Sequence, residues 1–238
     1  MQDLTHPHRI TSYECGADKK MKPECFQHFC QEMAEEHASA HGFGYDWVMT
    51  NRTAWVQVQG NYEILRRPDW KETVYLRTNT GKASALMAGR FVEMTDEEGN
   101  VLARADLSWV IIHFDTRRPV PPRRVGLPLE EPCPILGTPV QTPEWPEAPV
   151  TTAELHATRR DVDFNGHINN SAYLIWALDT LPAELQPGTE MRRYRIHFRG
   201  ESHAGDSMSI SHFVQGKYTR HVINSGTEPR AEIIVEWQ

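Results

Sequence analysis

The most informative part of this chain is residues 159–176, which read RRDVDFNGHINNSAYLIW. An acid, an amide and an imidazole alternate along it at Asp163, Asn165 and His167. An extended or turning backbone would point these side chains to a common side. Good helix N-caps follow, and apolar residues then recur at helical spacing as far as Pro182. The pattern predicts a carboxylate and an imidazole at the start of a helix, where backbone N–H groups can hold an oxyanion.

An ordinary turn is the alternative, because Asp, Asn and Gly cluster in turns and a helix-start histidine is often only a cap. The full string, however, resembles the hotdog thioesterases, and specifically the acyl-acyl carrier protein (acyl-ACP) thioesterase family. That family carries a D-x-N-x-H-x-N-N-x-x-Y-x-x-W signature, which residues 163–176 match at every signature position. The resemblance implies a thioester hydrolase that releases free fatty acid from acyl-ACP and so ends chain elongation.

The overall composition is that of a globular chain of 238 residues, with 39% hydrophobic and 24% charged residues. A formal net charge of −7 argues against nucleic acids or anionic membranes as partners. No apolar run approaches the length of a membrane span. The first residues lack a signal-peptide core and a transit-peptide composition, so we expect a cytoplasmic protein. Four cysteines and twelve histidines form no metal motif, and we expect neither a metal nor a cofactor.

The first half predicts one helix followed by antiparallel strands. A short strand is expected at residues 10–14 and a helix at residues 23–41, with Pro23 in its first turn. Period-two alternation then predicts further strands near residues 54–59, 74–76, 82–94 and 101–114. A hairpin turn is expected at residues 97–100, where Gly99 can take a positive φ.

A proline-rich segment divides the chain almost in half. Ten of the sixteen prolines lie in residues 117–150, a density that excludes a central strand and predicts an extended linker. After it the pattern of the first half returns, with a strand at residues 151–158 and then the signature and its helix. Further strands are predicted at residues 190–199, 206–214, 217–223 and 231–237. A strand, helix and sheet occurring twice indicate an internal duplication.

The family resemblance implies an α+β double hotdog: two tandem units, each with a long helix wrapped by a curved antiparallel sheet. We therefore expect an N-terminal hotdog at 1–116, a linker at 117–150 and a catalytic C-terminal hotdog at 151–238. Placing Pro23 on Asn169 sets Ala17, Lys19 and Met21 opposite Asp163, Asn165 and His167. In that register the first half has no catalytic set and supplies scaffold and acyl pocket only.

Thioester hydrolysis needs an activated water or carboxylate, a stabilised oxyanion and a shielded acyl chain. Asp163 can act as general base or as nucleophile, and the residues leave both roles open. Asn165 and His167 can orient the carboxylate, the water or the thioester oxygen. The helix start after His167 is expected to supply backbone donors for the oxyanion.

A second carboxylate is suggested at residues 199–202, which resemble the family's R-R-E-C segment. Glu201 falls on its acidic position and is the fourth predicted catalytic residue. Gly200 replaces the second arginine, and Ser202 stands where the family usually has cysteine. An unactivated hydroxyl is a poor nucleophile, so we do not expect Ser202 to attack the substrate.

The resemblance also implies two binding surfaces. The acyl pocket is expected from first-half residues that include Trp47, Trp55, Ala83, Ala85 and Met87. A basic rim for the acidic carrier is expected from six arginines near the linker and the signature: Arg117, Arg118, Arg123, Arg124, Arg159 and Arg160. The sequence does not set the preferred acyl length or saturation.

Two other functions stay open. An acyl-CoA thioesterase would use the same chemistry with a different carrier. A non-catalytic acyl-binding module would keep the fold, but binding alone does not need Asp163 beside a helix start. A monomer and a homodimer are both compatible with the sequence, because one double hotdog is already a pseudo-dimer.

Overall fold

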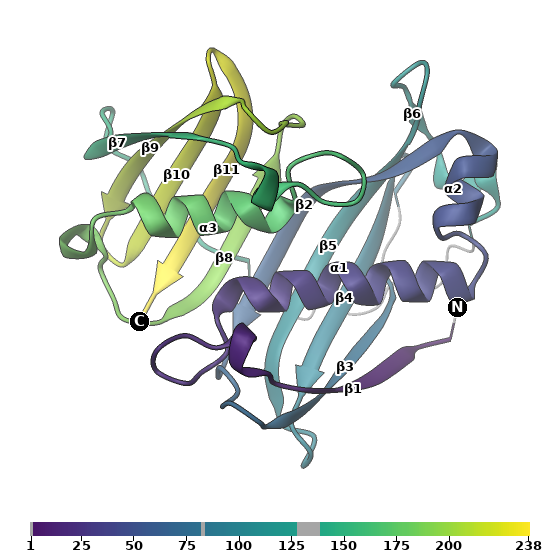
Figure 1. Ribbon diagram of the computed structural model, residues 1–238, viewed down its shortest axis with the longest axis horizontal. Coiled ribbons are helices and arrows are strands. Elements are labelled where there is room, and N and C mark those ends of the chain that lie inside the picture. Colours follow the sequence, from purple (N-terminus) through teal and green to yellow (C-terminus); the bar gives the residue numbers. More distant parts are fainter. Residues whose placement is uncertain (1, 82–83, 128–138) are drawn as a thin grey trace. The chain divides into compact units, whose positions relative to one another are not determined.

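The chain folds into two compact units, Met1–Thr138 (unit 1) and Pro139–Gln238 (unit 2). The computed structural model describes residues 2–81, 84–127 and 139–238. In each unit a helix lies across one face of an antiparallel sheet (Figure 1). This is the predicted α+β hotdog architecture.

Unit 1 contains a sheet in the order β1-β3-β4-β5-β2, with the short β6 paired to β5. Its strands are β1 (Leu4–Arg9), β2 (Thr53–Ile64), β3 (Thr73–Thr80), β4 (Met87–Thr95), β5 (Val101–His113) and β6 (Pro119–Val120). Its helices are α1 (Pro23–Ala40) and α2 (Tyr45–Asn51), with 3₁₀ turns η1 (Ser12–Glu14) and η2 (Pro122–Val125).

Unit 2 repeats this arrangement with the sheet order β7-β9-β10-β11-β8. Its strands are β7 (Thr151–His156), β8 (Met191–Phe198), β9 (Ser207–Gln215), β10 (Tyr218–Ser225) and β11 (Glu228–Trp237). The helix is α3 (Asn170–Thr180), and the 3₁₀ turns are η3 (Arg159–Asp161) and η4 (Ala183–Leu185). The five strands follow the same spatial order as β1 to β5, which confirms the predicted duplication.

The two long helices form where the sequence predicts them. Pro23 occupies the first turn of α1, where the missing N–H is harmless, and Phe26, Cys30 and Met33 are buried on one side of the helix. Asn169 caps α3 by accepting a hydrogen bond from the Ser171 N–H. Apolar burial along one face stabilises α1, whereas α3 is buried around most of its circumference.

The predicted strand at residues 10–14 is wrong. The strand comes earlier, as β1, and includes Pro7, which is tolerated because β1 is an edge strand of its sheet. Thr11 and Glu14 then form a capping box that turns the chain into η1. The sequence also did not predict α2, which is too short for a repeated apolar spacing.

The described part of the proline-rich segment is divided between the two units. Pro119 and Val120 pair with Ile112 and Ile111 of β5, so they extend the sheet of unit 1. Unit 2 begins at Pro139. The part of the predicted linker from 128 to 138 lies outside the described residues, as do residues 82 and 83 of the predicted strand at 82–94.

Candidate active site

The signature residues 162–168 form a tight turn in front of α3. Val162 and Ile168 bridge its two ends, and the Asp163 N–H donates to the His167 carbonyl at 2.9 Å. Inside the turn the Gly166 N–H donates to the Asp163 carbonyl at 3.0 Å. Gly166 has φ +82°, a conformation that glycine adopts without strain. The local sequence therefore determines this turn.

The three polar side chains of the turn do not bond to one another. The Asp163 carboxylate is half-buried and accepts the Asn165 N–H at 2.8 Å. Asn165 is exposed, and His167 is half-exposed. Within the described residues, no side-chain hydrogen bond joins Asp163, Asn165 and His167. Each can therefore reach a substrate independently.

Glu201 approaches this turn from the loop that follows β8. Its Oε2 lies 3.8 Å from His167 Nε2, with about a third of each side chain exposed, 33% for Glu201 and 39% for His167. The Ile168 N–H donates to the Ser202 carbonyl at 2.9 Å and so fastens the two loops together. The tertiary structure thus brings a carboxylate to the imidazole and leaves both accessible.

Ser202 is buried, and its hydroxyl is bonded to a tyrosine. The Tyr173 hydroxyl donates to Ser202 Oγ at 2.9 Å, and burial raises the pKa of Tyr173. No imidazole or carboxylate contacts Ser202 Oγ in the part of the chain that the structure describes. A serine nucleophile needs such a base, so this geometry supports a structural role for Ser202.

Three of the expected oxyanion donors at the start of α3 are engaged within the protein. The Ile168 N–H donates to Ser202, and the Asn169 N–H donates to the Asp161 carbonyl at 2.7 Å. The Ser171 N–H donates to Asn169 Oδ1 at 2.9 Å. The N-cap and the neighbouring loop thus satisfy three of the N–H groups that the sequence offered to the oxyanion, and that role stays a prediction.

Sequence reasoning also missed His203, whose ring lies against His167. The two ring centroids are 5.1 Å apart, and the ring planes make an angle of 75°. The sequence offered one indication of this histidine, because His203 follows the predicted catalytic residue Glu201 by two positions.

Unit 1 has a counterpart of the signature turn, but in a different register from the predicted one. Lys22 is the N-cap of α1 as Asn169 is of α3, so Pro23 corresponds to Asn170 and not to Asn169. The capping boxes starting at Thr11 and Thr158 give the same alignment. The predicted alignment is off by one residue because it matched Pro23, the first helical residue of α1, to Asn169, which is the N-cap of α3.

The corrected register sets Gly16, Asp18 and Lys20 opposite Asp163, Asn165 and His167. The Gly16 N–H donates to the Lys20 carbonyl at 3.0 Å, and the Lys19 N–H donates to the Gly16 carbonyl at 3.0 Å. Lys19 has φ +63°, in the place of Gly166. The backbone of the turn is therefore retained in unit 1, without a carboxylate at the position of Asp163.

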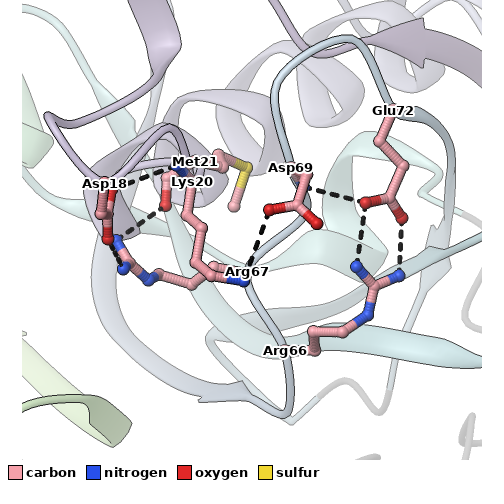
Figure 2. Close-up of polar contacts among 7 residues, drawn as sticks. All are labelled: Asp18, Lys20, Met21, Arg66, Arg67, Asp69 and Glu72. Carbon is pink, nitrogen blue, oxygen red and sulfur yellow. Dashed lines mark hydrogen bonds and ion pairs between the residues drawn. The ribbon is translucent and has the colours of Figure 1, made fainter.

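The loop between β2 and β3 likewise corresponds to the loop after β8. The Met21 N–H donates to the Pro68 carbonyl at 2.8 Å, as Ile168 donates to Ser202, which places Arg67 at the position of Glu201. Asp69 then takes the position of His203. Figure 2 shows the result: Arg67 pairs with Asp18, and Lys20 Nζ lies 3.4 Å from Asp69 Oδ1. Ion pairs thus occupy this turn in unit 1.

The residues predicted for the acyl pocket lie in different environments of unit 1. Trp55, half-buried on β2, donates its Nε1–H to the Phe43 carbonyl at 3.1 Å, and the Trp47 ring of α2 packs edge-on against the Phe43 ring. Met87 is 42% exposed, whereas Ala88 beside it on β4 is buried. Met87 therefore faces away from the space between α1 and the sheet.

Of the two other pocket candidates, the structure describes only Ala85. Ala85 is exposed on the bend before β4, and Ala83 lies outside the described residues.

All six predicted carrier-binding arginines are exposed. Four belong to unit 1 and two to η3 of unit 2: Arg117, Arg118, Arg123 and Arg124, and then Arg159 and Arg160.

A long helix across an antiparallel sheet, with an acidic turn and an imidazole at the helix start, defines a hotdog protein of the thioesterase class. Family comparison identifies the group. The N-terminal domain of the acyl-ACP thioesterases matches residues 3–123, and their C-terminal domain matches residues 146–238. The chain belongs to the acyl-ACP thioesterase family.

Individual relatives agree with this assignment. The chain is 27% identical over 225 residues to the chloroplastic oleoyl-acyl carrier protein thioesterase 1 of Arabidopsis thaliana, covering 83% of this chain and 60% of that protein. The chain thus spans less than two thirds of that curated relative.

Solved structures share the fold over nearly the whole chain. An acyl-ACP thioesterase from Bacteroides thetaiotaomicron has a TM-score of 0.86 at 24% identity, covering 99% of this chain and 98% of that one. The 12:0-ACP thioesterase from Umbellularia californica has a TM-score of 0.85 at 20% identity, covering 99% and 97%.

Proposed function

We propose that this protein hydrolyses acyl-ACP to free fatty acid and carrier, as a step that ends fatty acid elongation. The observation that carries the proposal is the approach of Glu201 to His167, 3.8 Å apart, beside the Asp163 turn. Membership of the acyl-ACP thioesterase family supports the choice of substrate. The Arabidopsis relative is named for an oleoyl-ACP substrate.

In the proposed reaction Asp163 takes a proton from water as the water oxygen attacks the thioester carbonyl carbon. The tetrahedral oxyanion then collapses, the carbon–sulfur bond breaks, and the proton passes to the departing thiolate. The exposed Asn165 amide and the His167 ring are suited to donate to the oxyanion, since three of the nearby helix-start donors are engaged within the protein. Glu201 orients His167 or the water. Direct attack by Asp163, with a later hydrolysis, is the alternative route.

The two binding surfaces also remain proposals. Trp47 and Trp55 are the tryptophans that we propose for the acyl-binding part of unit 1. The six exposed arginines are proposed to attract the acidic carrier, which the net charge of −7 would otherwise repel. No helix among the described residues is long and apolar enough to cross a membrane. A cytoplasmic location and the oligomeric state stay predictions.

Turnover assays with one acyl group on two carriers test the proposal. We expect higher kcat/KM on acyl-ACP than on acyl-CoA, with an advantage that falls as salt screens the arginines. Equal efficiency on both carriers, or an efficiency independent of salt, would favour an acyl-CoA thioesterase. Acyl binding without turnover on either carrier would instead indicate a binding module.

A further inference from the structure

A contact between two loop positions recurs in both units, with different chemistry in each. In unit 1, Lys20 of the first turn pairs with Asp69 of the β2–β3 loop, at 3.4 Å (Figure 2). In unit 2 the corresponding residues are His167 and His203, whose rings meet edge to face at 5.1 Å. The recurrence indicates that the loop framework brings these two positions together, whatever their side chains are.

The peptide group that joins Ser202 to His203 is hydrogen-bonded through both its N–H and its carbonyl. Its N–H donates to Asp206 Oδ2 at 2.9 Å, as the Asp69 N–H donates to Glu72 Oε2 at 2.9 Å in unit 1. The preceding carbonyl, of Ser202, accepts the Ile168 N–H from the signature turn. His203 is exposed, yet its ring starts from an anchored position.

We propose that His203 is a positioning residue for His167, a role that rests on the proposed thioester hydrolysis. The edge-to-face contact limits rotation of the His167 ring and holds its Nε2 toward Glu201. Neither the family signature nor the R-R-E-C segment includes this position.

The chemistry of the pair explains why a second imidazole suits the site. Glu201 and His203 face the His167 ring from the β8–β9 loop, and Asp163 belongs to the same turn as His167. A carboxylate at position 203, as Asp69 provides in unit 1, would add a second anion beside the ring and favour its cationic form. An imidazole orients the His167 ring by shape without a permanent charge.

Three variants separate positioning from general stability. His203→Ala should lower kcat about tenfold with KM nearly unchanged, because the lost ring contact acts on His167 and not on substrate binding. His203→Phe keeps an aromatic ring and should restore most of kcat. His203→Asp should move the limb of the pH–rate profile that reports His167 toward higher pH. His156→Ala, at another exposed histidine of unit 2, is the matched control. It should leave kcat, KM and the pH–rate profile unchanged.

A spectroscopic readout makes the test independent of turnover. The ring-proton resonances of His167 should be displaced by the His203 ring current in the parent and in His203→Phe, and should lose that displacement in His203→Ala. Unchanged His167 resonances and a parental kcat in His203→Ala would overturn the proposal, as would a His203→Phe enzyme no better than His203→Ala. A ring-current effect in an enzyme that hydrolyses no thioester would support the contact and refute the proposed function instead.

Discussion

Arg67 in unit 1 holds the loop position that Glu201 holds in unit 2. Each precedes the residue whose carbonyl accepts an N–H from the turn before the helix, Pro68 in one unit and Ser202 in the other. The two side chains have opposite charges and different contacts. Arg67 binds Asp18 and closes its loops, whereas Glu201 stands beside a half-exposed imidazole. In unit 1 an ion pair joins the two loops, and in unit 2 the corresponding loops hold the side chains that we propose for catalysis.

The ion pair of unit 1 should therefore matter for stability and not for turnover. Arg67→Gln should lower the free energy of unfolding by about 0.5–1 kcal/mol, a discounted value because Asp18 is 46% exposed. A double-mutant cycle with Asp18→Asn, followed by urea denaturation, measures the coupling. Strictly additive effects, or a loss of kcat in Arg67→Gln, would contradict this assignment.

Asp163→Asn should abolish most of the activity and leave the fold intact. The substitution keeps an acceptor for the Asn165 N–H but removes the base, and a positioned base contributes about 10²–10⁴-fold to rate. Single-turnover hydrolysis gives the rate, and thermal unfolding checks the fold. Asp179→Asn, at an exposed acid of α3, is the control. A folded Asp163→Asn protein with near-parental activity would show that the turn is not the catalytic site.

Ser202→Ala and Glu201→Gln should differ strongly. Ser202→Ala removes one hydrogen bond to Tyr173, and we expect a loss of about tenfold or less. Glu201→Gln removes the carboxylate beside His167 and should cost far more. Mass spectrometry of enzyme quenched during turnover distinguishes attack by Ser202 from a mechanism that uses Asp163. An acyl group on the peptide that contains Ser202 would exclude our assignment of Asp163.

A buried polar chain in unit 2 fixes the hydrogen-bond directions of two histidines. The Thr180 hydroxyl donates to the Trp176 carbonyl, so it must accept from His212 Nε2 at 3.2 Å. His212 Nδ1 then accepts from His221 Nδ1 at 2.8 Å, and His221 Nε2 accepts from the Thr219 hydroxyl at 2.9 Å. Both imidazoles are neutral in this arrangement.

This chain predicts a loss of stability in mild acid. Burial lowers the pKa of both His212 and His221, that of His221 to about 3 from an ordinary 6.5. The unfolded chain binds these protons first, so stability is full above about pH 6.5 and falls as the pH drops toward 3. The slope approaches about 1.4 kcal/mol per pH unit for His221, and His212 adds to it in the same direction.

Urea midpoints between pH 7.5 and 4.5 measure this dependence. His221→Leu should flatten it, while lowering stability at neutral pH because Thr219 and His212 lose a partner. An equally steep profile in the variant would place the acid sensitivity elsewhere in the protein.

The arginines of η3 should influence the choice of carrier. Arg159→Ala with Arg160→Ala should lower kcat/KM on acyl-ACP about three- to tenfold at low salt, and much less at high salt. The effect on acyl-CoA should be smaller. Arg123→Ala with Arg124→Ala tests the same idea in unit 1. If neither pair changes the salt dependence, these arginines only keep the surface charged.

The sequence alone determined the signature turn, its helix and the duplicated order of elements. These features follow from local rules, which include Asn169 as an N-cap, a glycine that takes a positive φ at position 166 and period-two alternation in the strands. The α+β class and the family follow from the same residues, since the signature is continuous in the chain.

Only the tertiary structure decided which groups meet. The approach of Glu201 and His203 to His167 depends on the hydrogen bond between Ile168 and Ser202, which are far apart in sequence. The same contact uses one of the helix-start donors that the sequence offered to the oxyanion. The alignment of unit 1 with unit 2 also needed the structure, because an N-cap residue and a first helical residue cannot be told apart from the sequence. Packing and loop closure set these relationships, and neither leaves a local pattern of residues.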